Sequence, residues 1–385
     1  MWNKKLIYSW IVICLIFLSP TICYANKNEE TLKEQQTEFG INDFIKNAKE
    51  YKGEFFEDID ISEIMQNAIN GKVDNSNFFK RVFILIGQEF GKNLTGLGSI
   101  LAIILIHSIL KSISEDLENN DISKIIYYIQ YILIVTIIMT NFSNIIEIVQ
   151  KTCSNLVDFM NMLIPILTSL MIYTGSITTT SMIEPIMLFV TNFVGNIIKD
   201  IIIPLVLIFT SIVILSKLTD KIQMEKLSKF MKSGITWLLV IILTIFVGVI
   251  SLEGTLSSSV DGLTAKTTKA VVSSAIPIVG KILGDAVDTV LGCGIILKNA
   301  VGVVGVIIVA GICIVPILKL SVLTIGYKLL AGISEPIADK KIVELLEQMG
   351  DIFKIFLAIL SALVFMIIIG TALVLKISNS GMMYR

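Results

Sequence analysis

Histidine is almost absent from this chain of 385 residues, which contains only His107. A single histidine cannot build an HExxH zinc site, and the sequence also has no GxSxG motif and no P-loop. An intramembrane aspartyl protease would carry paired aspartates in contexts such as GxGD, but Gly284-Asp285 lacks the flanking glycine and no YD partner occurs. These absences predict a protein that is not an enzyme and that uses no cofactor or metal.

Cysteine and charge are also sparse. The five cysteines show no CxxC spacing, and Cys14 and Cys23 fall in the first 25 residues. The other three, Cys153, Cys293 and Cys313, are expected to serve as small apolar residues of membrane helices. Charged residues make up 16% of the chain, the net charge is −1 and the pI is near 6.0. This balance gives no sign of a nucleic-acid partner.

The chain is rich in apolar residues instead, with 54% hydrophobic residues and a mean hydropathy of +0.81. They form blocks that are long enough, or nearly so, to cross roughly 30 Å of hydrocarbon as helices. These blocks include Leu94–Leu110, Ile125–Thr140, Ile201–Leu215, Ile235–Ile250, Val301–Val315 and Ile355–Leu375. Because a helix satisfies its own backbone in lipid, the predicted fold is an all-α, polytopic helical membrane protein. His107 lies in the first block, where it is expected to hydrogen-bond between helices or at the interface.

The first 25 residues have the pattern of a signal peptide. Lys4 and Lys5 form a basic start, Leu6–Leu18 an apolar core, and Cys23-Tyr24-Ala25 a cleavage-like site. The alternative is an uncleaved N-terminal anchor. Either arrangement places the polar segment that follows, residues 26–93, outside the cytoplasm.

The first part of this segment, Asn26–Lys80, is acidic, with 12 acidic and 7 basic residues. It also contains two amphipathic patterns. The apolar positions have helical spacing. They are Ile41, Phe44, Ile45 and Ala48, and then Ile61, Ile64, Met65 and Ala68. Asp60 is placed to cap the second helix and Gly71 to end it. Two interpretations stay open: a helical hairpin that rests on the membrane or on the chain's own helices, and a docking surface for an extracytoplasmic partner.

Lysines indicate the orientation. The stretch Lys217–Lys232 holds the densest basic patch and is therefore predicted to be cytoplasmic. Ala338–Met349 carries a similar charged pattern around an apolar stripe of Ile342, Leu345, Leu346 and Met349. Both stretches are predicted to be helices on the membrane surface, with contact to a cytoplasmic partner as the alternative.

Proline spacing suggests an internal duplication. Pro165 and Pro204 are 39 residues apart, as are Pro277 and Pro316. Each pair opens with Ile-Pro and encloses two apolar stretches. We therefore predict two transmembrane helices in residues 94–150, followed by two parallel repeats, residues 151–252 and 253–385. Because several segments are short enough to be re-entrant, the count comes to roughly eight to ten membrane segments.

Charges inside the second repeat mark a candidate site. Lys281, Asp285 and Asp288 have i, i+4, i+7 spacing and share one helix face, while Gly280, Gly284 and Gly292 allow close helix packing. The matching part of the first repeat has a hydroxyl cluster before a carboxylate. The hydroxyl cluster consists of Thr178, Thr179, Thr180 and Ser181, and the carboxylate is that of Glu184. These residues predict either an internally paired helix bundle or the lining of a hydrated path.

Three stretches carry a family resemblance. They are IPIVGKILGDAVDTVLGCGIILKNAVGVVGV (276–306), LIPILTSLMIYTGS (163–176) and GISEPIAD (332–339). With the signal peptide, the polar segment and the last apolar block in the same order, the chain resembles the stage III sporulation protein AE family of endospore-forming bacteria. Lys281 and Cys293 depart from the expected small or polar residues.

The resemblance implies a place in the multi-protein A-complex of the mother-cell membrane. That complex, which resembles parts of secretion machines, is expected to join the forespore's stage II sporulation protein Q and to support forespore development as a channel. The resemblance maps no catalytic or ligand-binding residue onto this chain. Two hypotheses follow: a non-enzymatic subunit of the complex that contacts the other A-complex proteins and membrane lipid, or a permease whose path is lined by the candidate residues.

Overall fold

The computed structural model describes residues 29–51, 60–70, 78–116, 120–218, 224–249 and 279–380. Within these ranges the regular structure is entirely helical, which confirms the predicted all-α class. The predicted signal peptide, residues 1–25, lies outside the described part of the chain.

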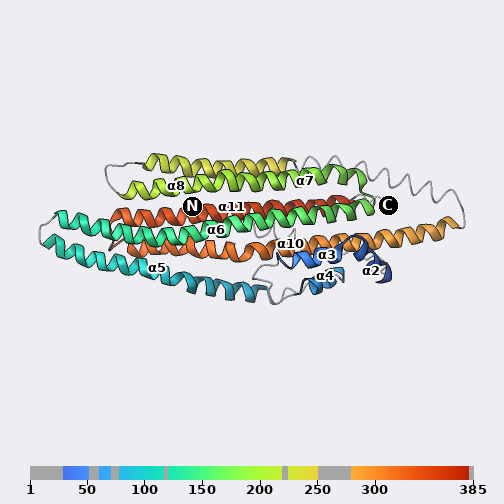
Figure 1. The fold of residues 1–385 in the computed structure, drawn as a ribbon, viewed down its shortest axis with the longest axis horizontal. Coiled ribbons are helices and arrows are strands. Elements are labelled where there is room, and N and C mark those ends of the chain that lie inside the picture. Colours follow the sequence, from blue (N-terminus) through green and yellow to red (C-terminus); the bar gives the residue numbers. More distant parts are fainter. Residues whose placement is uncertain are drawn as a thin grey trace.

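Long helices run side by side along one axis (Figure 1). They are α5 (Phe78–Asp116), α6 (Asn120–Tyr173), α7 (Ile177–Ile197), the π-helix η2 (Ile198–Ile202), α8 (Ile203–Leu218), the helix Glu225–Val249, α10 (Val279–Ser334) and α11 (Lys340–Ser380). From top to bottom, Figure 1 shows the helix Glu225–Val249, then α7 and α8, then α11 with α6, and then α10 and α5. α11 contacts α6, α7, α8 and α10, and therefore lies at the centre.

Six helices of the described residues are long and apolar enough to cross a membrane, in agreement with the predicted polytopic helical class. The predicted number of roughly eight to ten membrane segments refers to the whole chain and stays a prediction. Pro165 lies inside α6 and Pro316 inside α10, so neither proline ends its helix. Before Pro204, the helix widens into the π-helix η2, which is a recognised way to absorb a local disruption of the helical hydrogen-bond ladder. The chain thus continues as a helix through each of these prolines.

A true reversal occurs between α6 and α7. Gly175 adopts a φ of 89°, which is open to glycine without steric cost. The Gly175 N–H donates to Ile172 O at 2.9 Å, and the Ser176 N–H donates to Met171 O at 2.9 Å. This pair of bonds is the Schellman arrangement that ends a helix. The corresponding part of α10 continues without a turn, so the two proposed repeats differ here; the duplication itself stays a prediction.

In the described residues, neither stretch predicted to lie on the membrane surface forms a separate short helix; residues 340–349 and 225–232 are the first turns of long helices. In α11, Ile342, Leu345, Leu346 and Met349 are fully buried, so the apolar stripe faces the bundle. Residues 225–232 begin the helix that runs to Val249. Periodicity identified the buried face correctly, but it could not distinguish burial in lipid from burial against other helices.

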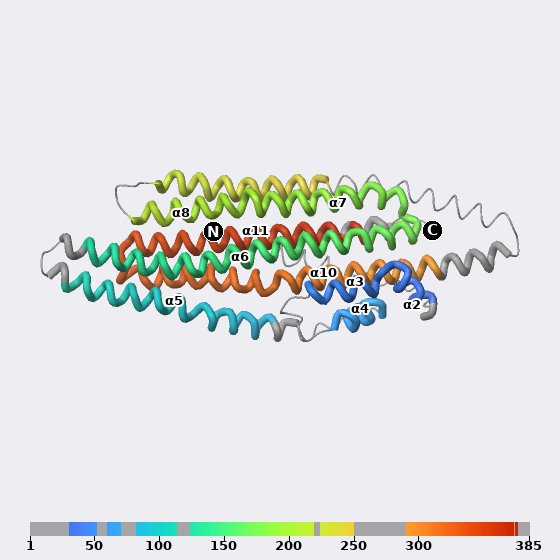
Figure 2. Tube along the Cα trace, viewed as in Figure 1, coloured from blue at the N-terminus to red at the C-terminus, as the bar shows by residue number. Residues whose placement is uncertain are grey.

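The N-terminal helices α2 (Glu29–Glu38), α3 (Ile41–Ala48) and α4 (Ile61–Ile69) cover part of α6 and α10 (Figure 2). The predicted stripes are confirmed, because Ile41, Phe44, Ile61 and Met65 are buried. Asp60 caps α4 by accepting a 3.1 Å bond from the Ser62 N–H. The segment rests on the chain's own helices, which is one of the two interpretations of the sequence.

Candidate functional site

The predicted charged face belongs to the N-terminal part of α10. The helix includes Lys281, Asp285 and Asp288, as well as Gly280 and Gly284, but their side chains lie outside the described residues. Gly292 is buried. Farther along α10, a Cβ added at Gly294 would approach Tyr173 Cδ1 to 2.9 Å, so α10 and α6 are in close contact there.

The predicted hydroxyl cluster lies at the start of α7. Thr179 and Thr180 are buried, Thr178 and Glu184 are half-buried, and Ser181 is exposed. Thr180 Oγ1 donates to Ser176 O at 2.6 Å, and Ser181 Oγ donates to Thr178 O at 2.9 Å. These two hydroxyls therefore bond to the backbone of their own helix start.

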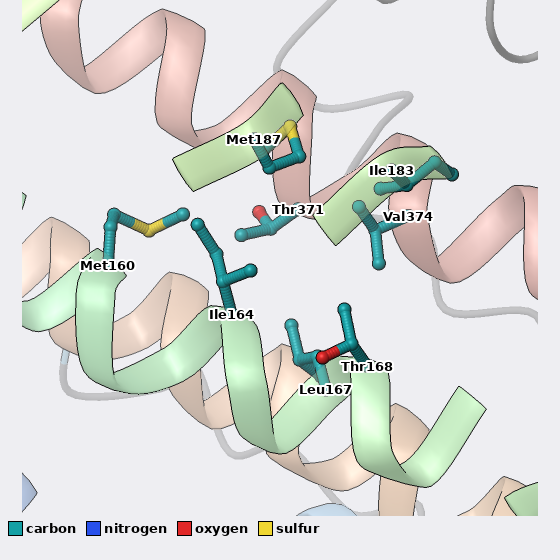
Figure 3. A pocket seen from close by; sticks show the side chains of 8 residues that line it. All are labelled: Met160, Ile164, Leu167, Thr168, Ile183, Met187, Thr371 and Val374. Atoms are coloured by element: carbon teal, nitrogen blue, oxygen red, sulfur yellow. The ribbon is translucent and has the colours of Figure 1, made fainter. Parts of the chain in front are cut away.

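A small pocket lies where α7 meets α6 and α11 (Figure 3). Its volume is about 10 Å³, close to the smallest space that holds one water molecule. Apart from two threonines, its lining is aliphatic or methionine. The lining residues are Met160, Ile164, Leu167, Thr168, Ile183, Met187, Thr371 and Val374. Thr168 Oγ1 donates to Pro165 O and Thr371 Oγ1 to Ile367 O, each at 3.0 Å. Both hydroxyl donors are therefore satisfied by backbone carbonyls without a ligand or a water molecule in the pocket.

Amide side chains form hydrogen bonds between neighbouring helices at two places in the bundle. Asn161 of α6 and Asn192 of α7 exchange two amide hydrogen bonds of 3.1 and 2.9 Å. The Asn141 amide of α6 donates to the Tyr327 hydroxyl of α10 at 3.3 Å. In a membrane such contacts specify which helix faces meet.

An ionic site joins α5 to the turn between α10 and α11. His107 Nε2 lies 3.0 Å from Asp339 Oδ2, and Lys111 pairs with Oδ1 of the same carboxylate. The imidazole N–H donates, because an ionised carboxylate only accepts. This bond, helped by Lys111 and opposed by burial, lowers the pKa of Asp339 to about 2. The predicted interhelical role of His107 is confirmed, whereas its partner, 232 residues away, had no signal in the sequence.

Asp339 ends the stretch GISEPIAD, so the site coincides with one of the stretches on which the resemblance rests. A sequence model of the family described as stage III sporulation protein AE (spore_III_AE) matches residues 59–378, which is most of the chain. The chain belongs to the stage III sporulation protein AE family. The expected family is thereby confirmed, and with it a role in sporulation.

A relative from Bacillus subtilis (strain 168) is itself described as stage III sporulation protein AE. It is 27% identical to this chain over 319 residues, which are 82% of this chain and 80% of the relative. No solved structure matches. The region matched by the stage III sporulation protein AE model begins just before α4 and extends almost to the end of α11.

This stage III sporulation protein AE family member has further ion pairs at the same end of the bundle. Glu344 of α11 pairs with Lys217 of α8, and Asp351 of α11 pairs with Lys232 and, at 2.8 Å, with Lys328. The sequence identified the lysines of Lys217–Lys232 as a basic patch but gave no sign of their carboxylate partners. These pairs fasten α8, the helix Glu225–Val249 and α10 to the central helix.

Proposed function

We propose that this chain is a non-enzymatic integral membrane subunit of a trans-envelope, secretion-like complex that links the mother cell and the forespore during endospore formation. Helix length is the observation that carries the proposal. α6 has 54 residues and α10 has 56. At 1.5 Å per residue each is roughly 80 Å long, more than twice the roughly 30 Å of hydrocarbon in a bilayer.

Tilt does not remove this excess. Membrane helices tilt by at most about 40°, which would still leave a span of roughly 60 Å along the membrane normal. A bundle of this length has substantial helical surface beyond the hydrocarbon, where subunits of a complex can attach. A transporter that works alone has no need for such an extension.

The proposed setting is the mother-cell membrane that surrounds the forespore, with the N-terminal segment outside the cytoplasm. The proposed partners are the other stage III sporulation A-complex proteins and, indirectly, the forespore's stage II sporulation protein Q. The exposed charged residues of α2 to α4, such as Lys33, Asp43 and Glu63, support this arrangement, because the apolar stripes and Gln35 are what these helices bury against the bundle.

The alternative is a permease with a path along Lys281, Asp285, Asp288 and the α7 hydroxyls. The α7 hydroxyl cluster gives it little support, because Thr180 and Ser181 bond to backbone carbonyls of their own helix start. The pocket of Figure 3 is also small and largely apolar. The subunit proposal is therefore preferred.

Substituting Asp285→Asn and Asp288→Asn together in a spore-forming host separates the two functions. Spore yield and co-purification of the A-complex proteins would be measured, with Asp200→Asn, at an exposed aspartate of η2, as the control. The subunit proposal predicts that spore yield falls only when co-purification falls. Lost spore yield with an intact complex would support the permease, and a native chain that never co-purifies with those proteins would contradict the proposal.

A further inference from the structure

Lysines outnumber carboxylates at the end of the bundle where α8 ends and α11 begins. Glu344 contacts both Lys217 and Lys340, the latter with an Nζ to Oε1 distance of 3.9 Å. Glu225 pairs with Lys229 at 2.7 Å and lies close enough to Lys217 and Lys340 to interact with their charges. These contacts bring the ends of three helices together.

We define the lysine cluster by the basic side chains on these three helix ends. It consists of Lys217, Lys226, Lys229, Lys340 and Lys341. Four carboxylates face or adjoin it, namely Glu225, Asp339, Glu344 and Glu347; because Asp339 pairs with Lys111, which is outside the cluster, two positive charges are left over. Lys340 and Lys229 are 90% and 75% exposed, so their ammonium groups are accessible.

Exposed apolar side chains adjoin the lysine cluster. Phe230 is 71% exposed and Leu227 is 44% exposed, on the same helical turns as Lys226 and Lys229. On α6, the Tyr127 hydroxyl donates to Lys217 O at 2.7 Å, and Lys341 Nζ lies 5.7 Å from the centre of the Tyr127 ring. Lysines next to exposed aromatic and aliphatic groups, at the ends of apolar helices, are typical of a membrane interface.

We propose that the lysine cluster binds the phosphate headgroup of an anionic phospholipid, whose acyl chains lie along Leu227 and Phe230. The excess positive charge attracts the phosphate, and basic sites between helix ends are known to bind anionic headgroups. The neighbouring apolar side chains favour a lipid over an acidic protein segment, because a segment of that kind would leave Phe230 uncovered.

The test uses the full chain in nanodiscs that contain equal amounts of phosphatidylglycerol and phosphatidylcholine, and native mass spectrometry counts the retained lipids. The native chain should retain phosphatidylglycerol in preference. Lys226→Gln, Lys229→Gln and Lys340→Gln together should lower that retention several-fold. The same three positions changed to Arg should keep it, since the charge is preserved.

The matched control replaces Lys33, Lys46 and Lys151, which are exposed on other helices, with glutamine. It should retain the lipid like the native chain. Equal retention of both lipids by the native chain, or equal loss in the control, would overturn the proposal. So would displacement of phosphatidylglycerol by inorganic phosphate alone, because the site would then recognise free phosphate. Unchanged thermal stability of the glutamine variant excludes unfolding as the cause of any loss.

Discussion

Gly195 lets α7 approach α6 more closely than any larger residue would, because a Cβ at this position would lie 2.5 Å from Val157 Cγ2. Valine is β-branched and has one strongly preferred rotamer in a helix, so its methyl group cannot turn away cheaply. Gly195→Ala is therefore expected to destabilise the chain by about 1–3 kcal/mol. The measurement is the thermal unfolding midpoint of the purified chain in detergent, which should fall.

Gly98 provides the control, because no atom lies within 4 Å of a Cβ added there. Alanine has the higher helix propensity, so Gly98→Ala should leave the midpoint unchanged or raise it. Equal midpoints for the two variants would show that α6 and α7 are not in close contact at Gly195.

The amide pair Asn161 and Asn192 should make a measurable contribution of its own. A double-mutant cycle with Asn161→Ala and Asn192→Ala is expected to give a coupling free energy of about 0.6 kcal/mol, the average for hydrogen bonds between membrane helices, and no more than about 1.7 kcal/mol. Asn196, which is exposed one turn farther along α7, supplies the control cycle with Asn161, and its coupling should be near zero. A coupling as large for Asn196 as for Asn192 would argue against the pairing.

At the scale of the helices, the turn between α10 and α11 is held to α5 through Asp339. Its pKa is lowered to about 2, first by the hydrogen bond from His107 and further by Lys111. An unfolded aspartate titrates near 3.9, so the ionised carboxylate stabilises the fold above about pH 4. That contribution is expected to disappear as the pH falls from about 4 toward 2. Asp339→Asn should lower the unfolding midpoint at pH 7 and weaken its dependence on pH in that window.

Asp43→Asn is the comparison for this variant, because Asp43 is exposed on α3, away from this turn. It should keep the midpoint of the native chain at pH 7. If Asp339→Asn and the native chain lost stability in parallel between pH 4 and pH 2, the carboxylate would not be the group responsible.

Sequence spacing predicted the buried faces of short helical stretches and one helix cap. The stripes at 41–48, 61–68 and 342–349, and the cap at Asp60, follow from spacing alone. The extent of the long helices does not follow from spacing, since the π-helix before Pro204 and the continuous helices around Pro165 and Pro316 depend on packing against neighbours. The pairing of His107 with Asp339 likewise requires the three-dimensional arrangement of helices distant in the sequence.

For the molecule as a whole, α6 is the helix that tests how far the bundle extends from the membrane. Ile125–Ile146 carries no charge and is 22 residues long, about 33 Å, which matches the hydrocarbon thickness. Glu147, Lys151 and Asp158 then follow, and all three are exposed. The C-terminal half of α6 is therefore expected to lie outside the hydrocarbon.

Single cysteines placed along α6, in a chain whose own cysteines are replaced, test this expectation in proteoliposomes with a water-soluble maleimide. Lys151→Cys and Asp158→Cys should react readily, whereas Ile129→Cys and Ile132→Cys should react slowly, although all four positions are exposed on the protein surface. The physical reason is that lipid covers the second pair and water covers the first. Slow labelling of Asp158→Cys would place that part of α6 in lipid and would remove the helix-length support for a subunit that reaches beyond the membrane.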